Sequence, residues 1–325
     1  MNILVVGGAG YIGSHMVKRL LKDGHHVMVM DNLSKGYRDA VLCDTFFEVD
    51  IADKTATAKV FEDYAIDAVF HFASFIEVGE SVKFPEKYFQ NNFEATRSLL
   101  EVMVKFHVKH FIFSSTAAVF GNPEYSPIDE KHPKRPINPY GESKLMVEKI
   151  LEDFDQEHGL KSVSLRYFNA AGADPEGQLG ERHQPETHLI PLVLQAASGR
   201  RDAISIFGDD YDTPDGTCVR DYIHIVDLAD AHMKAVDYLN QGNASAAFNL
   251  GNGKGFSVKE IIEAARKVTG KTIPVKLEGR RAGDPPTLVA DATLAKKILG
   301  WEPQFTDVRN IIQHAWNWET KFPWH

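Results

Sequence analysis

The sequence predicts an α/β fold in which a doubly wound parallel sheet is joined to a smaller, interleaved α+β domain. In the first half of this 325-residue chain, short apolar runs alternate with stretches of helical periodicity, which is typical of β–α–β units. A glycine-rich turn stands between the first apolar run and the first helical stretch. After Asn169 the chain changes to loops and shorter strands, which indicates a second structural unit.

The strands of the large sheet are expected at continuous apolar runs, because parallel strands are covered on both faces. These runs lie near residues 3–6, 27–30, 46–50, 68–73, 110–115 and 162–168. Amphipathic stretches between them predict crossover helices, notably at 54–64, 88–106 and 141–157. Ligands of such sheets bind beyond the carboxyl ends of the strands, so the residues at those ends are the candidates for function.

The second part is predicted to combine short strands with several helices. Ser257 and Glu260 have the spacing of a capping box and Gly270 follows as a helix stop, so residues 258–269 are expected to be helical. Helices are also expected at 188–198, 227–239, 292–299 and 307–318, and strands at 203–207, 247–250 and 272–276. We expect one domain to comprise residues 1–170 plus about 221–250, and the other about 171–220 plus 251–325.

The glycine-rich turn, Gly7-Gly8-Ala9-Gly10-Tyr11-Ile12-Gly13, follows the apolar run Ile3–Val6 directly and opens a helical stretch. This is the context of a Rossmann fingerprint, in which the backbone approaches a pyrophosphate at a helix N-terminus. Asp31 ends the next strand, 18 residues after Gly13, where a carboxylate can bind ribose hydroxyls and repels a 2′-phosphate. The turn therefore predicts NAD rather than NADP; the alternative is a glycine-rich turn that holds no ligand.

Composition disfavours several classes of partner. The net charge of −9, from 36 basic and 45 acidic residues, argues against nucleic acid or an anionic membrane as the main partner. No apolar run is long enough to span a bilayer, and the first residues are typical of a strand rather than a signal peptide. We therefore expect a cytoplasmic protein.

Cysteines and histidines predict no metal centre. Cys43 and Cys218 are spaced neither as a disulfide framework nor as zinc ligands. The 14 histidines include His25-His26, His183 and His188, but none of them form a convincing set of metal ligands. We therefore expect most histidines to be surface or packing residues.

Tyr140 and Lys144 stand four residues apart at the start of the 141–157 helix. Residues at this spacing share a helix face, so the ammonium group can lie close to the phenol. A free tyrosine has a pKa of about 10, which a neighbouring cation lowers. Pro139 suits a helix start, where the helix dipole also favours negative charge. The pair predicts a base that removes a proton from a hydroxyl group; the alternative is a surface pair on an ordinary helix.

Several motifs in one order resemble a known family. They are Gly7-Gly8-Ala9-Gly10-Tyr11-Ile12-Gly13, Asp31-Asn32-Leu33, His71-Phe72-Ala73, Val78-Gly79-Glu80-Ser81, Ser114-Ser115-Thr116, Tyr140-Gly141-Glu142-Ser143-Lys144, Leu165-Arg166-Tyr167-Phe168-Asn169, Val219-Arg220-Asp221-Tyr222-Ile223-His224 and Arg281-Ala282-Gly283-Asp284. Together they resemble the extended short-chain dehydrogenase/reductase superfamily and, within it, the UDP-glucose 4-epimerase family. The resemblance covers essentially the whole chain.

The resemblance implies an NAD-dependent isomerase that epimerises a UDP-hexose at C4. In this family tightly bound NAD⁺ takes the C4 hydride, and a transient 4-keto sugar receives it back on its other face. By resemblance Tyr140 is the base for the O4 hydroxyl, Lys144 lowers its pKa and holds the nicotinamide ribose, and Thr116 hydrogen-bonds the reacting hydroxyl or the phenol. A homodimer through the helices at 88–106 and 141–157 is also implied.

The resemblance also assigns binding residues. The expected cofactor-binding residues are Gly7, Gly10, Tyr11, Ile12, Gly13, Asp31, Asn32, Asp50, Ile51, Phe72, Ala73, Ser74, Asn91, Tyr140, Lys144 and Phe168. The expected substrate-binding residues are Thr116, Asn169, His188, Leu189, Phe207, Arg220, Arg281 and Asp284. A guanidinium group can bind a diphosphate through two parallel hydrogen bonds, which suits both arginines. Arg220 could instead pair locally with Asp221, and Phe207 could be a core residue.

Departures from the family pattern leave alternatives open. Ala117-Ala118 stand where nucleotide-sugar dehydratases carry an Asp-Glu pair, which argues against dehydration. Ile76 stands where some relatives carry a lysine that reaches the cofactor phosphates. Leu288 is intermediate in size at the pocket wall near the sugar C2 substituent, so it does not decide whether N-acetylated UDP-sugars are accepted. The alternatives are a UDP-N-acetylglucosamine 4-epimerase, another NAD-dependent nucleotide-sugar oxidoreductase and a non-enzymatic NAD-binding regulator.

Overall fold

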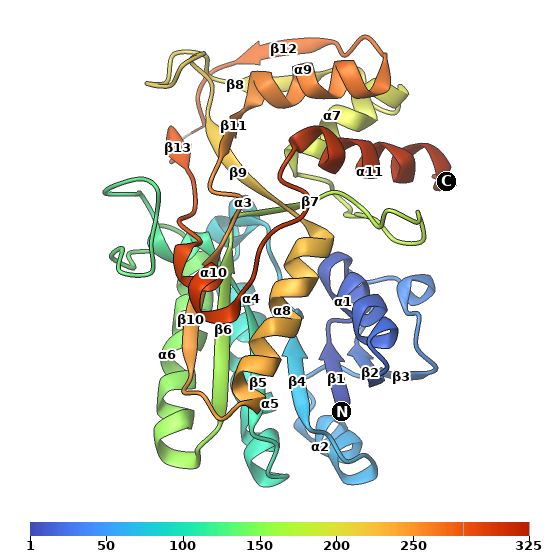
Figure 1. Cartoon of the computed structure of the whole chain (residues 1–325), viewed down its shortest axis with the longest axis vertical. Coiled ribbons are helices and arrows are strands. Elements are labelled where there is room, and N and C mark those ends of the chain that lie inside the picture. Colours follow the sequence, from blue (N-terminus) through green and yellow to red (C-terminus); the bar gives the residue numbers. More distant parts are fainter. Residues whose placement is uncertain (282, 325) are drawn as a thin grey trace.

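Seven parallel strands form the central sheet, which confirms the predicted fold class (Figure 1). The computed structural model describes residues 1–281 and 283–324. The strands lie in the order β10-β6-β5-β4-β1-β2-β3, so the first six follow the Rossmann order 3-2-1-4-5-6 when the sheet is followed from β3. Their bounds are β1 (Asn2–Val6), β2 (His26–Asp31), β3 (Thr45–Glu48), β4 (Ala68–His71), β5 (His110–Thr116), β6 (Lys161–Tyr167) and β10 (Ala246–Leu250).

Helices cover both faces of this sheet because alternate residues of each strand point to opposite sides. Ile3 and Val5 of β1 belong to the core on one face, whereas Leu4 and Val6 belong to the core on the other. The first face carries α1 (Tyr11–Lys22) and α8 (Ile225–Asn240), and the second carries α2 (Lys54–Asp63), α5 (Ala95–Lys105) and α6 (Pro139–His158). The continuous apolar strands of the sequence are therefore buried on both sides, as expected.

The second part of the chain lies beyond the carboxyl ends of these strands, at the top of Figure 1. Its core consists of α7 (Leu189–Ser198), α9 (Val258–Thr269) and α11 (Val308–Lys321), next to the parallel pair β8 (Ile204–Phe207) and β12 (Val275–Glu278). A small sheet, made of β7 (Asn169–Ala171), β9 (Val219–His224), β11 (Gly255–Ser257) and β13 (Thr287–Leu288), joins the two parts. The two parts are connected directly, because β9 of the small sheet continues into α8, which packs on the large sheet.

The last segment of the chain returns to the large sheet. Ala295, on α10 (Thr293–Leu299), and the fully buried Trp301 belong to the same core as α8. The Trp301 indole donates a hydrogen bond to the Asp227 carbonyl oxygen (2.9 Å). The domain limits stay a prediction, and this packing favours counting residues 292–301 with the large sheet. Within the described ranges, no helix has the length and apolar character that a bilayer span requires.

The helix predicted over 88–106 is divided. It consists of α4 (Pro85–Tyr88), a π-helical turn over Phe89–Glu94 and α5. The turn brings Asn92 to the loop after β4, where its side chain accepts a hydrogen bond from the Phe75 N–H (2.9 Å) and donates one to the Phe75 carbonyl (3.0 Å). Such turns inside helices are frequent at functional sites.

Other differences concern short elements. β12 begins at Val275 rather than 272, because Pro274 has no N–H to donate to a strand ladder. The structure also contains elements that the sequence did not indicate, since each is short or mixes polar with apolar residues. These are α3 (Val78–Lys83), the 3₁₀ turns Arg38–Ala40 and Ala117–Phe120, and the strands β7, β9, β11 and β13.

Candidate active site

The glycine turn between β1 and α1 forms a close backbone crossing. Gly7 has a φ of +79°, and a Cβ there would lie 2.5 Å from the Ala73 nitrogen. A Cβ on Gly13 would lie 2.1 Å from the Gly7 carbonyl oxygen. Gly10 is the N-cap of α1 and has no side chain to occupy its first turn. The backbone N–H groups at this helix start can therefore receive a pyrophosphate, which fits the predicted NAD.

Asp31 is fixed beside this turn at the end of β2. Its carboxylate accepts hydrogen bonds from the Ala9 N–H (2.9 Å) and the Leu33 N–H (2.8 Å), while burial raises its pKa. Asn32 donates to the Asp50 carboxylate (2.8 Å), which follows β3. The predicted ribose-binding residues therefore share one edge of the sheet with the glycine turn.

Two glycine variants separate the shape of the turn from ligand binding. Gly13→Ala is expected to destabilise the protein and abolish NAD binding, because its Cβ would overlap the Gly7 carbonyl oxygen. Gly10→Ala is expected to fold with near wild-type stability but without NAD, because its nearest protein atom would be 3.4 Å away and only the pyrophosphate approach is blocked. Thermal unfolding and NAD released by acid measure both effects. Full NAD content in Gly10→Ala would contradict the assignment.

Lys144 lies on α6 with its side chain almost fully buried, at 2% exposure. Its Nζ donates hydrogen bonds to Ser74 Oγ after β4 (2.7 Å) and to the Ser114 carbonyl on β5 (2.8 Å). Burial lowers the pKa of Lys144 to about 7, against the opposing effect of the Glu148 carboxylate. Two residues assigned to the cofactor, Ser74 and Lys144, are therefore in contact at the carboxyl edge of the sheet.

The lowered pKa of Lys144 predicts a pH-dependent stability. Between about pH 7 and its ordinary pKa of 10.5, the unfolded chain binds more protons at this lysine than the folded chain does. Stability from this group therefore rises with pH across that window. From pH 7.5 to 9.5, NAD-free wild type should gain roughly 2 kcal/mol more than Lys144→Met, since one proton corresponds to about 1.4 kcal/mol per pH unit. Urea unfolding at the two pH values measures the stability of both proteins. Equal gains in stability for wild type and Lys144→Met would refute the prediction.

Tyr140 occupies the first turn of α6, which Asn138 caps by accepting a hydrogen bond from the Gly141 N–H (2.8 Å). Burial raises the pKa of the phenol above its ordinary 10, and a hydrogen bond with the Thr116 hydroxyl opposes this shift. Desolvation disfavours the phenolate, and the Lys144 Nζ is directed at Ser74 and the Ser114 carbonyl. That Lys144 lowers the pKa of Tyr140 in the complete active site stays a prediction.

A buried ion pair holds α6 against the sheet behind these residues. Glu148 accepts two parallel hydrogen bonds from Arg166 of β6, at 2.8 and 2.7 Å, and one from the Ser115 hydroxyl (2.7 Å). The arginine lowers the pKa of the Glu148 carboxyl although burial opposes it. Because Glu148 is one turn after Lys144, this pair sets the position of the lysine relative to β5. The sequence analysis missed Glu148, although its spacing of four from Lys144 was visible.

The predicted diphosphate-binding residues gather where β8, β9 and the segment before β13 meet. The Arg281 guanidinium stacks over the Phe207 ring at 4.0 Å. Arg220 donates to the Val219 and Pro285 carbonyls (2.9 Å each) and lies 3.5 Å from the Asp284 carboxylate. Ala282, between the predicted residues of this motif, lies outside the described residues.

The alternative pairing of Arg220 with Asp221 is not what the structure contains. The fully buried Asp221 carboxylate accepts hydrogen bonds from the N–H groups of Asn252 (2.8 Å), Gly253 (3.1 Å) and Ala290 (3.2 Å). Burial raises its pKa to about 6. Asp221 therefore organises the loops, and its carbonyl accepts a hydrogen bond from Asn169 (2.8 Å), another predicted substrate residue.

The remaining predicted residues take varied positions. Ile51 and Phe72 pack in the two cores, so only their backbones are suited to a ligand. The Asn91 side chain donates to its neighbour Asn92 (3.0 Å). Phe168 packs on a small core cluster between α6 and the 3₁₀ turn Ala117–Phe120. Leu189 begins α7, directly after His188.

Leu288, assigned to the pocket wall, ends the short strand β13 and packs on the same small core cluster as Phe168. The next residue, Val289, is buried, and its carbonyl accepts a hydrogen bond from the Ile128 N–H (2.8 Å). The backbone after Leu288 is therefore fixed, which limits how far this side chain can move when a sugar binds.

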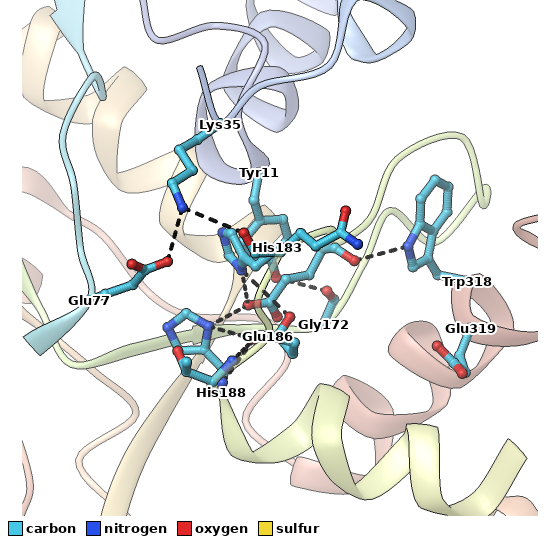
Figure 2. Close-up of polar contacts among 12 residues, drawn as sticks. Tyr11, Lys35, Glu77, Gly172, His183, Glu186, His188, Trp318 and Glu319 are labelled. Atoms are coloured by element: carbon cyan, nitrogen blue, oxygen red, sulfur yellow. Dashed lines mark hydrogen bonds and ion pairs between the residues drawn. The ribbon is translucent and has the colours of Figure 1, made fainter. Parts of the chain in front are cut away.

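His188 belongs to a group that the sequence did not reveal. Around it are Glu181, His183 and Glu186, close to Tyr11 of the glycine turn (Figure 2). The carboxylates raise the pKa of His183 to about 9 and that of His188 to about 10, although burial opposes both shifts. The spacing Glu181-x-His183-x-x-Glu186-x-His188 was the available signal, but it matches no regular helix or strand face.

Comparisons with known proteins identify the family of the chain. Residues 3–251 match the model of the NAD dependent epimerase/dehydratase family. The UDP-glucose 4-epimerase of Streptococcus mutans is 56% identical over 99% of this chain and 98% of its own length, and that of Halalkalibacterium halodurans is 52% identical over 99% and 97%.

Solved structures extend this similarity. The UDP-glucose 4-epimerase of Brucella ovis in complex with NAD has a TM-score of 0.95 at 49% identity and covers 97% of both chains. The enzyme of Bifidobacterium longum in complex with NAD⁺ and UDP has a TM-score of 0.94 at 40% identity and covers 99% of both. With a family match over most of its length and full-length relatives above 50% identity, the chain belongs to the NAD-dependent epimerase/dehydratase family.

Proposed function

We propose that this protein interconverts UDP-glucose and UDP-galactose by epimerisation at C4, through a transient 4-keto sugar. The observation that carries this proposal is the meeting of Thr116, Tyr140 and Lys144 at the carboxyl edge of the sheet, next to the glycine turn. Curated relatives that match nearly the whole chain are UDP-glucose 4-epimerases. The chain is therefore an NAD-dependent isomerase.

The residues of the chain have distinct roles in this reaction. NAD, when bound at the start of α1, supplies a reversible hydride acceptor. Tyr140 as phenolate removes the proton from the sugar O4, and the phenol so formed returns it; the Thr116 hydroxyl can donate and accept during that exchange. Lys144, held by Ser74 and the Ser114 carbonyl, is the residue assigned by resemblance to hold the nicotinamide ribose. Burial of the site keeps water away from the keto sugar.

The second part of the chain is proposed to hold the nucleotide diphosphate. Arg220 and Arg281 can neutralise the two phosphates, and Asp284 can accept hydrogen bonds from the uridine ribose. Arg281 is already oriented by the Phe207 ring, and Arg220 by the Val219 and Pro285 carbonyls. Such orientation lowers the entropy lost when the ligand binds.

The test of this function is incubation of the purified protein with UDP-galactose and no added NAD. The proposal predicts UDP-glucose as the only new sugar nucleotide, with no net oxidation. A requirement for stoichiometric added NAD, with accumulation of an oxidised sugar, would instead identify a net dehydrogenase. If the protein carries NAD but leaves UDP-galactose unchanged, the result would support the alternative of a non-enzymatic NAD-binding regulator.

An N-acetylated UDP-sugar is a second candidate substrate, because Leu288, at the proposed pocket wall, is intermediate in size and does not decide between the two sugars. The side chain is partly buried and packs on the small core cluster that includes Val119 and Phe120. One structural relative, 46% identical over 99% of this chain, is the UDP-Glc/GlcNAc 4-epimerase of Campylobacter jejuni. Turnover of UDP-N-acetylgalactosamine tests this candidate. If the wall at Leu288 controls entry, Leu288→Tyr should lose that activity and keep activity on UDP-galactose.

We also propose a homodimer through α5 and α6. Leu99, Leu100 and Met103 of α5 are buried within their own subunit, so they are not available to a partner. Phe89, Phe93 and Met146 keep part of their surface exposed and are the candidates for the contact. The chain has a mass of 36.4 kDa, and light scattering should report twice this value. A monomer at micromolar concentration would refute the dimer.

The cytoplasmic location stays a prediction, supported by two free, buried thiols.

A further inference from the structure

Four side chains of the segment before α7 converge, and one of them, His188, is also an expected substrate-binding residue. They are Glu181, His183, Glu186 and His188, which we call the Glu–His cluster. Each offers one ligand atom, and these four atoms all lie within 4.8 Å of one another. Figure 2 shows His183, Glu186 and His188 directed toward one another, with Tyr11 beside them.

Three of the four carboxylate–imidazole distances in the Glu–His cluster are shorter than the edges of a zinc coordination polyhedron, and the fourth matches them. His188 Nδ1 lies 2.8 Å from a Glu181 oxygen and 3.1 Å from a Glu186 oxygen. His183 Nδ1 lies 3.1 Å from Glu181 and 3.6 Å from Glu186. Ligands about 2.0–2.2 Å from a tetrahedral zinc ion lie roughly 3.3–3.6 Å from one another. Small movements of these side chains would therefore bring the four ligand atoms to the spacing of a tetrahedral zinc site.

Hydrogen bonds do not account for the approach of all these atoms. Glu181 is only 7% exposed, and its Oε1 makes ion-pair contacts with His183 Nδ1 (3.1 Å) and His188 Nδ1 (2.8 Å). Among the described residues, however, neither this oxygen nor the His183 Nδ1 has a partner aligned for a hydrogen bond. The Glu186 carboxylate, in contrast, is fixed by the N–H groups of Thr187 (2.7 Å) and His188 (2.8 Å). Unpaired buried polar atoms are costly, so atoms that face one point indicate a shared ligand.

The chemistry of the four groups identifies that ligand. Two carboxylates and two neutral imidazoles carry a charge of −2, which one divalent cation cancels. Imidazole nitrogen favours zinc and related transition metals, whereas magnesium and calcium favour all-oxygen sites. We propose that the Glu–His cluster binds one divalent transition-metal ion of the zinc type. The competing state has an additional proton on each imidazole in place of the metal.

The position of the Glu–His cluster gives the ion a structural role. Four protein ligands close the coordination of zinc and leave no position for a reacting water. The cluster segment contacts both parts of the protein, since the Trp318 indole on α11 donates to the Glu181 carbonyl (3.3 Å) and the Tyr11 ring lies 6.2 Å from the His183 ring. Tyr11 in turn donates to the Gly172 carbonyl (2.7 Å). A bound ion would therefore stabilise the connection between the glycine turn and the second part.

Zinc binding to the full-length protein tests the proposal. Protein stripped with a chelator and dialysed should bind one Zn²⁺ per chain in competition with a chromogenic chelator, and its thermal midpoint should rise with free zinc. Co²⁺ in its place should give the visible bands of a tetrahedral site, and Mg²⁺ should not compete. His183→Ala should weaken zinc binding by more than the roughly 10–100-fold that loss of an outer partner costs.

Matched variants distinguish loss of the zinc site from a general effect of the substitution. His26→Ala removes an exposed histidine of β2 and should bind zinc like the wild type. If His183→Ala does not fold, Glu186→Gln keeps the side-chain shape and should also lose tight binding. The proposal is overturned if the wild type binds no zinc, or if His183→Ala and Glu186→Gln bind it as tightly as His26→Ala does. Either outcome would identify the cluster as ion pairs between carboxylates and protonated imidazoles.

Discussion

Tyr140→Phe is expected to lower kcat on UDP-galactose by roughly 10²–10⁴-fold, the usual contribution of a positioned acid–base group. The phenol is the proposed base for O4, and phenylalanine keeps the ring while removing the proton acceptor. KM for the sugar nucleotide should change little, because the substrate diphosphate is assigned to other residues. The amount of bound NAD should change little because the other expected cofactor-binding residues are unaltered. Steady-state kinetics and acid release of NAD measure these quantities.

Tyr167→Phe is the matched control for this experiment. Its hydroxyl pairs with that of Ser114 one strand away, and burial raises its pKa, as it does for Tyr140. It has no assigned role in proton transfer, so its removal should change kcat only a few-fold. If Tyr140→Phe stayed within a few-fold of wild type, the base would have to be another group.

Arg166→Met is expected to lower the free energy of unfolding by about 3–5 kcal/mol, which is typical when one partner of a buried ion pair is removed. Glu148 has 3% side-chain exposure and Arg166 has 5%. The carboxylate left behind would keep the Ser115 hydroxyl (2.7 Å) and Lys134 (3.6 Å), but it would lose both guanidinium hydrogen bonds with little access to solvent. The variant should also lose activity, because α6 carries both Tyr140 and Lys144. Urea unfolding followed by circular dichroism measures the stability.

A second substitution distinguishes the unpaired charge from lost packing. Adding Glu148→Leu to Arg166→Met removes the buried carboxylate and should restore much of the stability. Arg309→Met provides a surface comparison, because its ion pair with Asp307 is exposed, and its unfolding midpoint should stay close to wild type. If Arg166→Met and Arg309→Met lost equal amounts of stability to unfolding, burial of the Glu148–Arg166 pair would contribute nothing to that stability.

The sequence predicted best those features that depend on neighbouring residues. The continuous apolar strands, the capping box at Ser257 and the turn from Gly7 to Gly13 each follow from local periodicity and backbone sterics. Asp31 could be placed because a strand of predictable length separates it from the turn. Parallel strand order then brought Thr116, Tyr140 and Ser74 to one edge.

Features that depend on distant contacts were not predictable in the same way. The π-helical turn at Asn92 is associated with its bonds to Phe75, 17 residues earlier. The raised pKa of Tyr140 depends on burial by the complete fold, which its four-residue spacing to Lys144 does not reveal. The Glu–His cluster depends on the path of an irregular segment, so four polar residues that appeared separate in sequence share one point in space.

The most direct test of the proposed reaction follows the hydrogen at C4. UDP-galactose carrying deuterium at C4 is incubated with the purified protein in ordinary water without added NAD, and the UDP-glucose formed is examined by mass spectrometry and NMR. If the hydride leaves and returns within one active site, as proposed for the chain with its bound NAD, the product retains the deuterium at C4. Loss of the deuterium to water would show that C4 exchanges a proton instead, and would contradict the hydride mechanism.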